Sequence, residues 1–205
     1  MSEREPGLRE RRKAGVRRSI QEHALALFVE RGYDATTVAD VAQAAEVSSM
    51  TVFRYFPTKE DLVLTDEFDP VLTERVRARP ASEGPMRRIA ATLVESMAET
   101  SEQDRRMLLT RLRLGMATPA LRARYLDNQF LTQQALVQAL RDDPADPEEE
   151  FRLNVAAGAC LAAVTTALVR WADQDGEPDP AELMARALAI VTTGATPPNP
   201  IDEEE

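Results

Sequence analysis

The sequence VADVAQAAEVSSMTVFRYFPTK, which runs from Val38 to Lys59, decides the fold of one end of this 205-residue chain. Apolar residues recur in it at helical spacing, both before and after a break at residues 46–48. Thr37 and Asp40 have the spacing of a capping box for the first helix, and the Ser48 hydroxyl can cap the second. The pattern therefore predicts a helix, a tight turn and a second helix.

The residues on either side of this stretch predict two more helices. A helix is expected from about Arg12 to Arg31, with Gly32 as its C-terminal stop. Its apolar stripe consists of Ile20, Ala24, Leu27 and Phe28. Thr58 and Asp61 repeat the capping pattern, which predicts the start of a fourth helix. In the middle of the head, Val52 and Phe56 are expected to pack in the core.

The composition of the whole chain favours helices over strands. Aromatic residues make up 5% of it and glycines number 8, whereas Ala, Leu, Arg and Glu are abundant. Prolines divide the part after residue 62 into segments, and Asp69-Pro70 is placed to kink or split the fourth helix. The helices expected after it are Pro85–Glu102, Asp104–Ala117, Pro119–Arg141, Pro147–Asp173 and Pro180–Thr193. We predict an all-α fold of about nine helices, with a three-helix head that carries the helix-turn-helix and a helical bundle behind it.

Charge is distributed unevenly along the chain. The formal net charge is -10, but residues 1–62 carry 10 basic and 10 acidic side chains, so the acidic excess lies in residues 63–205. Because DNA affinity rests on Lys and Arg meeting phosphate, this pattern fits a protein that touches DNA with its head alone. We expect residues 1–11 to be a flexible basic arm, which either follows phosphates or solubilises the chain, and residues 195–205 to be a disordered acidic tail.

Few residues of the chain suit catalysis or metal binding. It has one cysteine, Cys160, and one histidine, His23, with no CxxC pair and no glycine-rich phosphate loop. We therefore expect no enzyme activity, no cofactor, no metal site and no disulfide within the chain. A single cysteine is typical of a reducing cytoplasm, and the first residues lack a secretory signal. Since the apolar run at residues 155–169 is too short for a membrane span, we expect a cytoplasmic protein without a membrane partner.

The run ALALFVERGYDATTVADVAQAAEVSSMTVFRYFPTKEDLVL, from Ala24 to Leu64, resembles the DNA-binding domain of TetR-type bacterial transcription regulators. The resemblance covers roughly residues 15–64. It joins the G-Y loop, the T-T-V-x-D-V-A helix, the V-S-x-x-T turn and the F-x-Y-F-P-T-K-E-D-L ending in one order. It implies a DNA-binding domain at residues 12–62 and a ligand-binding and dimerisation domain at residues 63–194. The implied partners are double-stranded operator DNA, a second copy of the chain and a small ligand.

The same resemblance assigns DNA contacts to individual residues. It implies that phosphates are held by Thr37, Tyr55 and Lys59. It implies that bases face Ser49, Met50, Thr51 and Phe53. Ser48 is interpreted as the helix cap with an added phosphate contact. Two residues depart from the family pattern: Glu46 stands where glycine is frequent, and Phe53 replaces a frequent tyrosine, which keeps a contact to a thymine methyl group but loses a hydroxyl contact.

The segment from Val155 to Trp171 is apolar or small on nearly every side. We expect such a helix to pack against its own domain with one face and against a second copy with another. The last helix is expected to complete a four-helix dimer interface through Leu183, Ala187, Leu188 and Val191. Burial within the monomer is the alternative. A two-fold dimer presents two reading helices to half-sites about 34 Å apart, which predicts a palindromic operator.

A ligand pocket is expected among the interior faces of the helices that come before this interface. The candidate lining residues are Leu93, Met97, Leu108, Leu112, Met116, Phe130, Leu131, Gln134 and Val164. Flexible Met side chains and few polar groups suit a long apolar ligand, although ordinary core packing explains the same residues. Arginines near this region could meet an anionic head group or form a solvated helix face. They are Arg105, Arg106, Arg111 and Arg113.

The run RLRLGMATPALRARYLDNQ, from Arg111 to Gln129, and the later VRWADQDG resemble the C-terminal domain of regulators related to the mycofactocin-system regulators. This second resemblance covers roughly residues 85–190 and implies an acyl-CoA-like ligand. The leading prediction is a repressor that a small amphiphilic ligand, first of all a fatty acyl-CoA, releases from its operator. A drug or secondary-metabolite sensor that controls efflux or biosynthetic genes comes second, and a helical interaction protein that does not bind DNA comes third.

Overall fold

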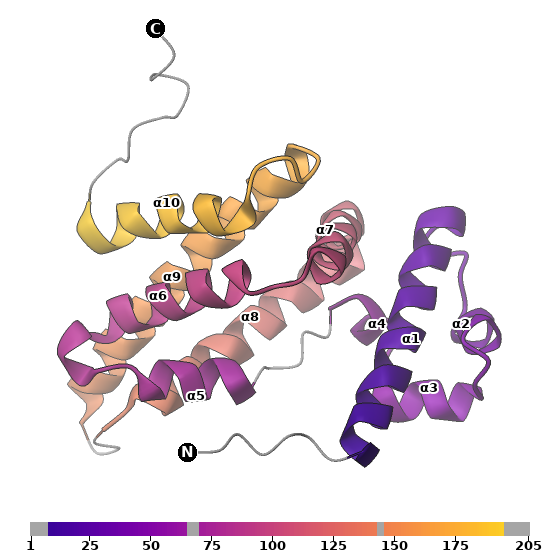
Figure 1. The fold of residues 1–205 in the computed structure, drawn as a ribbon, viewed down its shortest axis with the longest axis horizontal. Helices are drawn as coiled ribbons and strands as arrows, with labels where there is room; N and C mark the ends of the chain where they lie inside the picture. Colours follow the sequence, from indigo (N-terminus) through magenta and orange to yellow (C-terminus); the bar gives the residue numbers. More distant parts are fainter. Residues whose placement is uncertain (1–7, 65–69, 143–145, 195–205) are drawn as a thin grey trace, which may run out of the picture. The chain divides into compact units, whose positions relative to one another are not determined.

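The computed structural model describes residues 8–64, 70–142 and 146–194, and this part of the chain consists of helices and connecting loops without strands (Figure 1). The all-α fold is therefore confirmed. Side chains are not described at residues 8–11 and 70. Three sequence-based expectations fall wholly or partly outside the described residues: the arm at residues 1–7, the bend at Asp69 and the acidic tail at residues 195–205.

Four helices form the head: α1 (Leu8–Arg31), α2 (Val38–Ala44), α3 (Ser49–Tyr55) and α4 (Asp61–Leu64). α1 begins at Leu8, so residues 8–11 of the expected flexible arm are helical. All members of its expected apolar stripe are buried: Ile20, Ala24, Leu27 and Phe28. Gly32 follows α1 with a φ of 88°, in the left-handed region that favours glycine, and the helix ends there as expected.

The larger unit is built from α5 (Pro70–Ala78), the short 3₁₀ helix η1 (Ala81–Glu83), α6 (Pro85–Ala98), α7 (Glu102–Ala117), α8 (Pro119–Leu140), α9 (Pro147–Asp173) and α10 (Pro180–Thr193). The prolines that were expected to begin α6, α8, α9 and α10 do begin them. Among the helices of this unit, the largest error in an expected boundary is at the end of α6, which stops at Ala98 rather than Glu102. The expected fourth helix begins with α4, and α5 follows from Pro70; residues 65–69 between them are not described.

The chain divides into two compact units, and the head is not continuous in sequence. Residues 113–125, at the end of α7 and the start of α8, belong to the head unit, whereas the sequence patterns had ended the head at residue 62. Leu121 in this segment is fully buried, and Arg124 Nη2 lies 3.6 Å from Asp61 Oδ1. That residues 113–125 belong to the head unit is hard to predict, because a single buried leucine in a polar helix gives little signal in the sequence.

α9 is the central helix of the larger unit, and it packs with α6 and α10 (Figure 1). Its buried side includes Leu153, Cys160 and Trp171. With 27 residues and a mean hydropathy of 1.6 over its most apolar window, α9 passes a length and composition test for a membrane span. The helix is thus longer than the apolar run at residues 155–169 on which the expectation rested. The core of a folded domain accounts for the same composition, because ten residues of α9 are buried.

Candidate DNA-reading face and ligand cavity

Three side-chain caps fix the starts of the helices in the head. At α2, Thr37 N donates to Asp40 Oδ2 at 2.7 Å and Asp40 N donates to Thr37 Oγ1 at 3.2 Å, which makes a full capping box. The hydrogen bonds from the Thr37 side chain and backbone lower the pKa of Asp40 below its ordinary value. At α3, Thr51 N donates to Ser48 Oγ at 3.1 Å. The expected caps are therefore confirmed.

The third cap, at α4, pairs Thr58 with Asp61. Thr58 N donates to Asp61 Oδ2 at 2.9 Å, and Asp61 N donates to Thr58 Oγ1 at 3.2 Å. This reciprocal pair satisfies two backbone donors that would otherwise lack partners at the start of a helix. Each cap was predictable because its two side chains lie three residues apart in the sequence.

The turn between α2 and α3 places Glu46 in the left-handed region, with a φ of 55°. Val47 N donates to Ala42 O at 2.9 Å and Glu46 N donates to Gln43 O at 3.2 Å, which is the pair of hydrogen bonds of a Schellman motif. The position after a helix cap in this motif favours glycine, because a Cβ in the left-handed region costs about 1–2 kcal/mol. The frequent glycine at this position therefore has a backbone cause, and Glu46 carries strain.

The surface of α3 separates into a core side and an exposed side. Val52 and Phe56 are 0% and 1% exposed, as expected for core residues, whereas Met50 and Phe53 are 82% and 49% exposed. Large apolar side chains exposed on a short capped helix are suited to contact with thymine methyl groups and base edges in a major groove. Met50 and Phe53 are therefore available for the role that the sequence assigned to them.

The remaining DNA candidates differ in how far their own domain already engages them. Thr37 and Ser48 are exposed, and Ser49, Thr51 and Tyr55 are half-buried. Their hydroxyls are not all free, since Thr51 Oγ1 lies 3.0 Å from Ser48 Oγ. Tyr55 also packs within the head, because its ring centroid lies 5.4 Å from Arg54 Cζ.

Lys59 has partners within the head that the sequence did not indicate. Its Nζ donates to the carbonyl oxygen of Tyr33 at 2.6 Å and lies 4.2 Å from the centroid of the Tyr33 ring. Tyr33 Oη in turn donates to Glu60 Oε1 at 3.0 Å, and burial, followed by this contact with Glu60, raises the pKa of Tyr33. The positive charge of Lys59 is unfavourable at the start of α4 because the helix dipole is positive there. The contacts of Lys59 with Tyr33 explain its presence, since they hold the loop between α1 and α2.

The nine expected ligand-lining residues lie in different surroundings. Leu93, Met97, Leu108 and Leu112 are half-buried against the core of the larger unit, and Val164 is part of that core. Gln134 Nε2 donates to Asn154 Oδ1 at 3.3 Å. The expectation of an interior position was wrong for Met116, Phe130 and Leu131, which are 36%, 60% and 57% exposed.

The two errors on α8 have different causes. Leu131 lies on the exposed side of α8, seven residues before the exposed Gln138. Phe130 is in helical phase with the buried Val137, but it lies before the part of α8 that enters the core of the larger unit, which begins at Leu136. Met116 was misplaced for another reason. It lies in the segment of α7 that belongs to the head unit.

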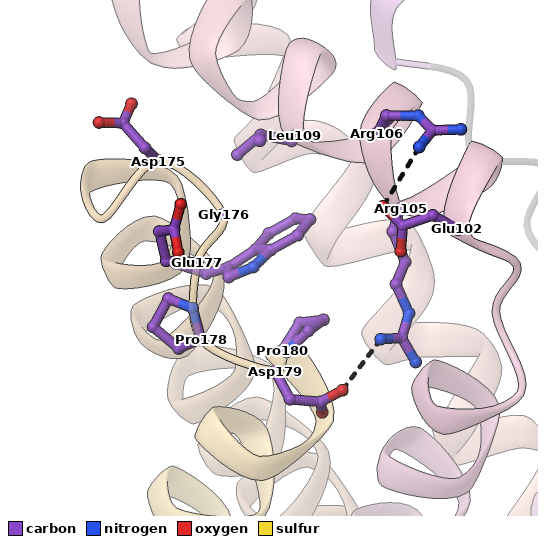
Figure 2. Close-up of a pocket in the computed structure, with 11 residues that line it drawn as sticks. Glu102, Arg105, Arg106, Leu109, Asp175, Gly176, Glu177, Pro178, Asp179 and Pro180 are labelled. Atoms are coloured by element: carbon purple, nitrogen blue, oxygen red, sulfur yellow. Dashed lines mark hydrogen bonds and ion pairs between the residues drawn. The ribbon is translucent and has the colours of Figure 1, made fainter.

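A cavity of about 420 Å³ opens in the larger unit between the first half of α7 and the turn that joins α9 to α10 (Figure 2). None of the nine expected residues lines it. Its lining consists of Glu102, Arg105, Arg106, Leu109, Trp171, Asp175, Gly176, Glu177, Pro178, Asp179 and Pro180. Its size is within the range of small-molecule sites. Two sequence signals could have drawn attention to it: the single tryptophan of the chain and the Asp-Gly turn after α9.

Arg105 joins three helices at the edge of this cavity. Its Nη1 donates to Asp179 Oδ2 at 2.9 Å (Figure 2). Its Nε donates to Thr100 O, after the end of α6, at 3.2 Å. Asp179 also caps α10, since it accepts from Ala181 N at 2.8 Å. Burial alone raises the pKa of Asp179, but the hydrogen bonds from the start of α10 and from Arg105 outweigh it and lower that pKa. Arg105 is therefore already engaged.

The described part of the chain offers few side chains for metal binding or thiol chemistry. No group of three metal-ligating side chains occurs among residues 8–64, 70–142 and 146–194. Cys160 is buried, its Sγ donates to Met86 O at 3.6 Å, and burial raises its pKa to about 11. The thiol therefore stays protonated at neutral pH, and it is not among the residues that line the cavity.

Known families match both parts of the chain. Residues 20–65 match the family of bacterial regulatory proteins of the TetR type, and residues 83–196 match the MftR C-terminal domain. The regulator TcmR of Streptomyces glaucescens is 31% identical over 156 residues, which cover 72% of this chain and 69% of TcmR.

Solved structures share the fold. A TetR-family regulator of Streptomyces coelicolor is 22% identical with a TM-score of 0.55, and the match covers 93% of this chain and 99% of that one. FadR of Thermus thermophilus, a TetR-family repressor crystallised with lauroyl-CoA, is 26% identical with a TM-score of 0.50, and the match covers 90% of this chain and 97% of that one.

Proposed function

We propose that this chain, which belongs to the TetR family of bacterial transcription regulators and has a C-terminal domain of the MftR type, is a cytoplasmic repressor that a small ligand releases from DNA. The observation that carries the proposal is the exposed side of α3, where Met50 and Phe53 face solvent beside the buried Val52 and Phe56. Core packing does not account for the first two residues, whereas a base-reading role does.

The roles within the head follow from this placement. Base edges are read by Ser49, Met50, Thr51 and Phe53. Phosphates are held by Thr37, Ser48, Tyr55 and Lys59, so the latter group sets affinity and the former sets sequence preference. Lys59 can serve both its own domain and DNA, because its ammonium has two N–H donors besides the one directed at Tyr33 O.

A second copy of the chain is proposed to pack on α9 and α10. Val155 on α9 is 52% exposed, and Ile190 and Val191 on α10 are 52% and 38% exposed. Leu183 and Leu188, which were expected in this interface, are 7% and 2% exposed and pack in the core of their own unit. We therefore place Ile190, rather than these two leucines, in the proposed interface. Burial of this apolar face in a two-fold dimer yields two reading helices and a palindromic operator.

The ligand is proposed to be a small amphiphile. Support for a fatty acyl-CoA comes from the lauroyl-CoA complex of the 26% identical Thermus thermophilus FadR. The half-buried apolar residues Leu93, Met97, Leu108 and Leu112, with Val164 and Gln134, would open to hold an acyl chain. A drug or secondary metabolite, sensed for an efflux or biosynthetic gene, is the second candidate. The observation that favours it is the excess of carboxylates around the cavity described above. Either ligand must favour the conformation that does not bind DNA.

Gel shifts on DNA that flanks the gene for this chain, and on sequences selected from a random library, test the proposal. A sequence-selective shift that lauroyl-CoA or a cationic drug reverses is expected. A protein that shifts no DNA selectively would instead be a helical interaction protein with an unused helix-turn-helix. Within the head, Lys59→Ala should weaken binding to all sequences, whereas Thr51→Ala should change sequence preference. If both changes act alike, the division of roles is wrong.

A further inference from the structure

The cavity between α7 and the α9–α10 turn has an unbalanced set of charges. Four carboxylates line it against two guanidinium groups, and the two arginines are paired: Arg105 with Asp179 at 2.9 Å and Arg106 with Glu102 at 3.4 Å (Figure 2). The lining also contains Asp175 and Glu177. Glu177 is exposed and forms no ion pair with any residue in the described part of the chain. The field in the cavity therefore favours a positive charge.

The same cavity contains a hydrogen-bond donor that has no acceptor. Trp171 is 3% exposed, and its Nε1 is buried without a partner among the described residues. Buried N–H groups are nearly always paired, because an unpaired one has lost its water and gained nothing. A bound molecule with a hydrogen-bond acceptor would give Trp171 Nε1 the partner that it lacks.

The turn at Gly176 lies close to Trp171 and Leu109. Gly176 has a φ of 79°, and a Cβ at this position would lie 3.7 Å from Trp171 Cε2, the ring carbon that is bonded to Nε1. The same Cβ would lie 2.7 Å from Leu109 Cδ2. A side chain at residue 176 would thus clash with Leu109, and the glycine lets the turn pack against both apolar groups that line the cavity.

We propose that this cavity binds a small cationic amphiphile, with an ammonium group near Glu177, an apolar body against Leu109 and Trp171, and an oxygen acceptor for Trp171 Nε1. Two features exclude the phosphates of an acyl-CoA from this cavity: the acidic excess and the prior engagement of both arginines. Because the molecule would be the ligand of a ligand-responsive regulator, the proposal rests on the function proposed above. It selects a cationic drug or metabolite over an acyl-CoA as the occupant of this site.

A matched pair of esters tests the charge and the acceptor. In 2-(dimethylamino)ethyl benzoate a protonated amine, a phenyl ring and a carbonyl oxygen are combined, and 3-methylbutyl benzoate has the same shape without the charge. By calorimetry on the full chain, the cation should bind about tenfold more tightly than the neutral ester, as expected for one charge pair in a partly exposed site. Since Trp171 is the only tryptophan, its fluorescence should change on binding.

Three variants separate the contributions. Glu177→Gln should lower the preference for the cation at least about threefold, whereas Asp173→Asn, an exposed carboxylate outside the lining, should leave it unchanged. Trp171→Phe keeps an aromatic ring and should weaken both esters equally, by about fivefold. Glu177 is exposed, so its replacement does not endanger folding, and circular dichroism checks the Trp171 variant.

Several outcomes would overturn the proposal. These are equal binding of the two esters, no binding of either at millimolar concentration, an equal effect of the Glu177 and Asp173 variants, or competition between lauroyl-CoA and the cationic ester. The calorimetry contains no DNA, so its failure would leave the regulator function to be decided by the gel shifts. A failed gel shift would likewise leave the cavity to be decided by calorimetry.

Discussion

The head and the larger unit differ in the distance along the chain over which their functional features are determined. In the head, each cap is formed by two side chains three residues apart, such as Thr37 with Asp40. The cavity of the larger unit is lined from Glu102 on α7 to Pro180 on α10, and no local pattern joins those residues. Short-range chemistry therefore made the reading helix predictable, whereas the cavity depends on how three helices meet.

The largest expected effect tests the separation of the two sides of α3. Phe56→Ala should lower the free energy of unfolding of the head by about 3–5 kcal/mol, because it removes a fully buried ring on which Arg17 Cζ lies at 4.7 Å. Phe53→Ala should change that free energy by less than about 0.5 kcal/mol and weaken DNA binding. Urea denaturation of both variants measures the difference. Equal destabilisation would mean that Phe53 is a core residue.

Next in size is the link between α7 and α10. Asp179→Ala removes a helix cap and the partner of Arg105, and we expect a loss of about 2 kcal/mol after allowance for the partly exposed ion pair. Asp146→Ala is a matched control, because Asp146 caps α9 through Glu148 N but lies 4.0 Å from Arg152. The control should cost about 1 kcal/mol. Thermal unfolding of both variants shows whether Arg105 contributes beyond the cap.

The pH dependence of stability follows from the same residue. The folded pKa of Asp179 is lowered, so the stability that its carboxylate contributes is present above its unfolded pKa of about 4 and is lost as the pH falls through the folded pKa. The stability difference between the wild type and Asp179→Ala should thus shrink below about pH 4. A difference that stays constant down to pH 2 would contradict the role of the charged form.

Features of the fold that depend on neighbouring residues were predictable from the sequence, and features that depend on distant residues were not. The caps at Thr37, Ser48 and Thr58 and the prolines that start four later helices were predictable, because their effects on the backbone are local. The exposure of Phe130 was not, because Phe130 is in helical phase with the buried Val137 and only the fold shows where along α8 the core of the larger unit begins. The link from Lys59 to Tyr33 O joins residues 26 positions apart and likewise required the fold.

A smaller effect is expected at Lys59, where the head has both a structural and a DNA-binding use for one side chain. Lys59→Met keeps an apolar stem near the Tyr33 ring but loses the hydrogen bond to Tyr33 O, which should cost about 1 kcal/mol of stability. If the ammonium also holds a phosphate, the salt dependence of DNA binding should fall by about 0.9 in its logarithmic slope. A stability loss with an unchanged slope would leave Lys59 with the structural role alone.

The smallest expected effect is a gain. Glu46→Gly should stabilise the head by about 1 kcal/mol, because glycine relieves the left-handed strain at φ 55°. It should also strengthen binding to all DNA sequences, since a carboxylate near phosphates is removed. Glu46→Gln removes the charge and keeps the strain, so it should share only the second effect. Denaturation and gel shifts of the two variants separate strain from charge, and a stabilised Gln variant would contradict the backbone explanation.

The central claim is that the exposed side of α3 reads an operator as one half of a two-fold pair. Selection of binding sites from random DNA by the full chain, repeated with Thr51→Ala, tests it most directly. We predict a palindromic sequence with half-sites about 34 Å apart or a multiple of it, and a base preference within each half-site that changes in the variant. Enrichment of no sequence, or of the same sequence by both proteins, would contradict the claim.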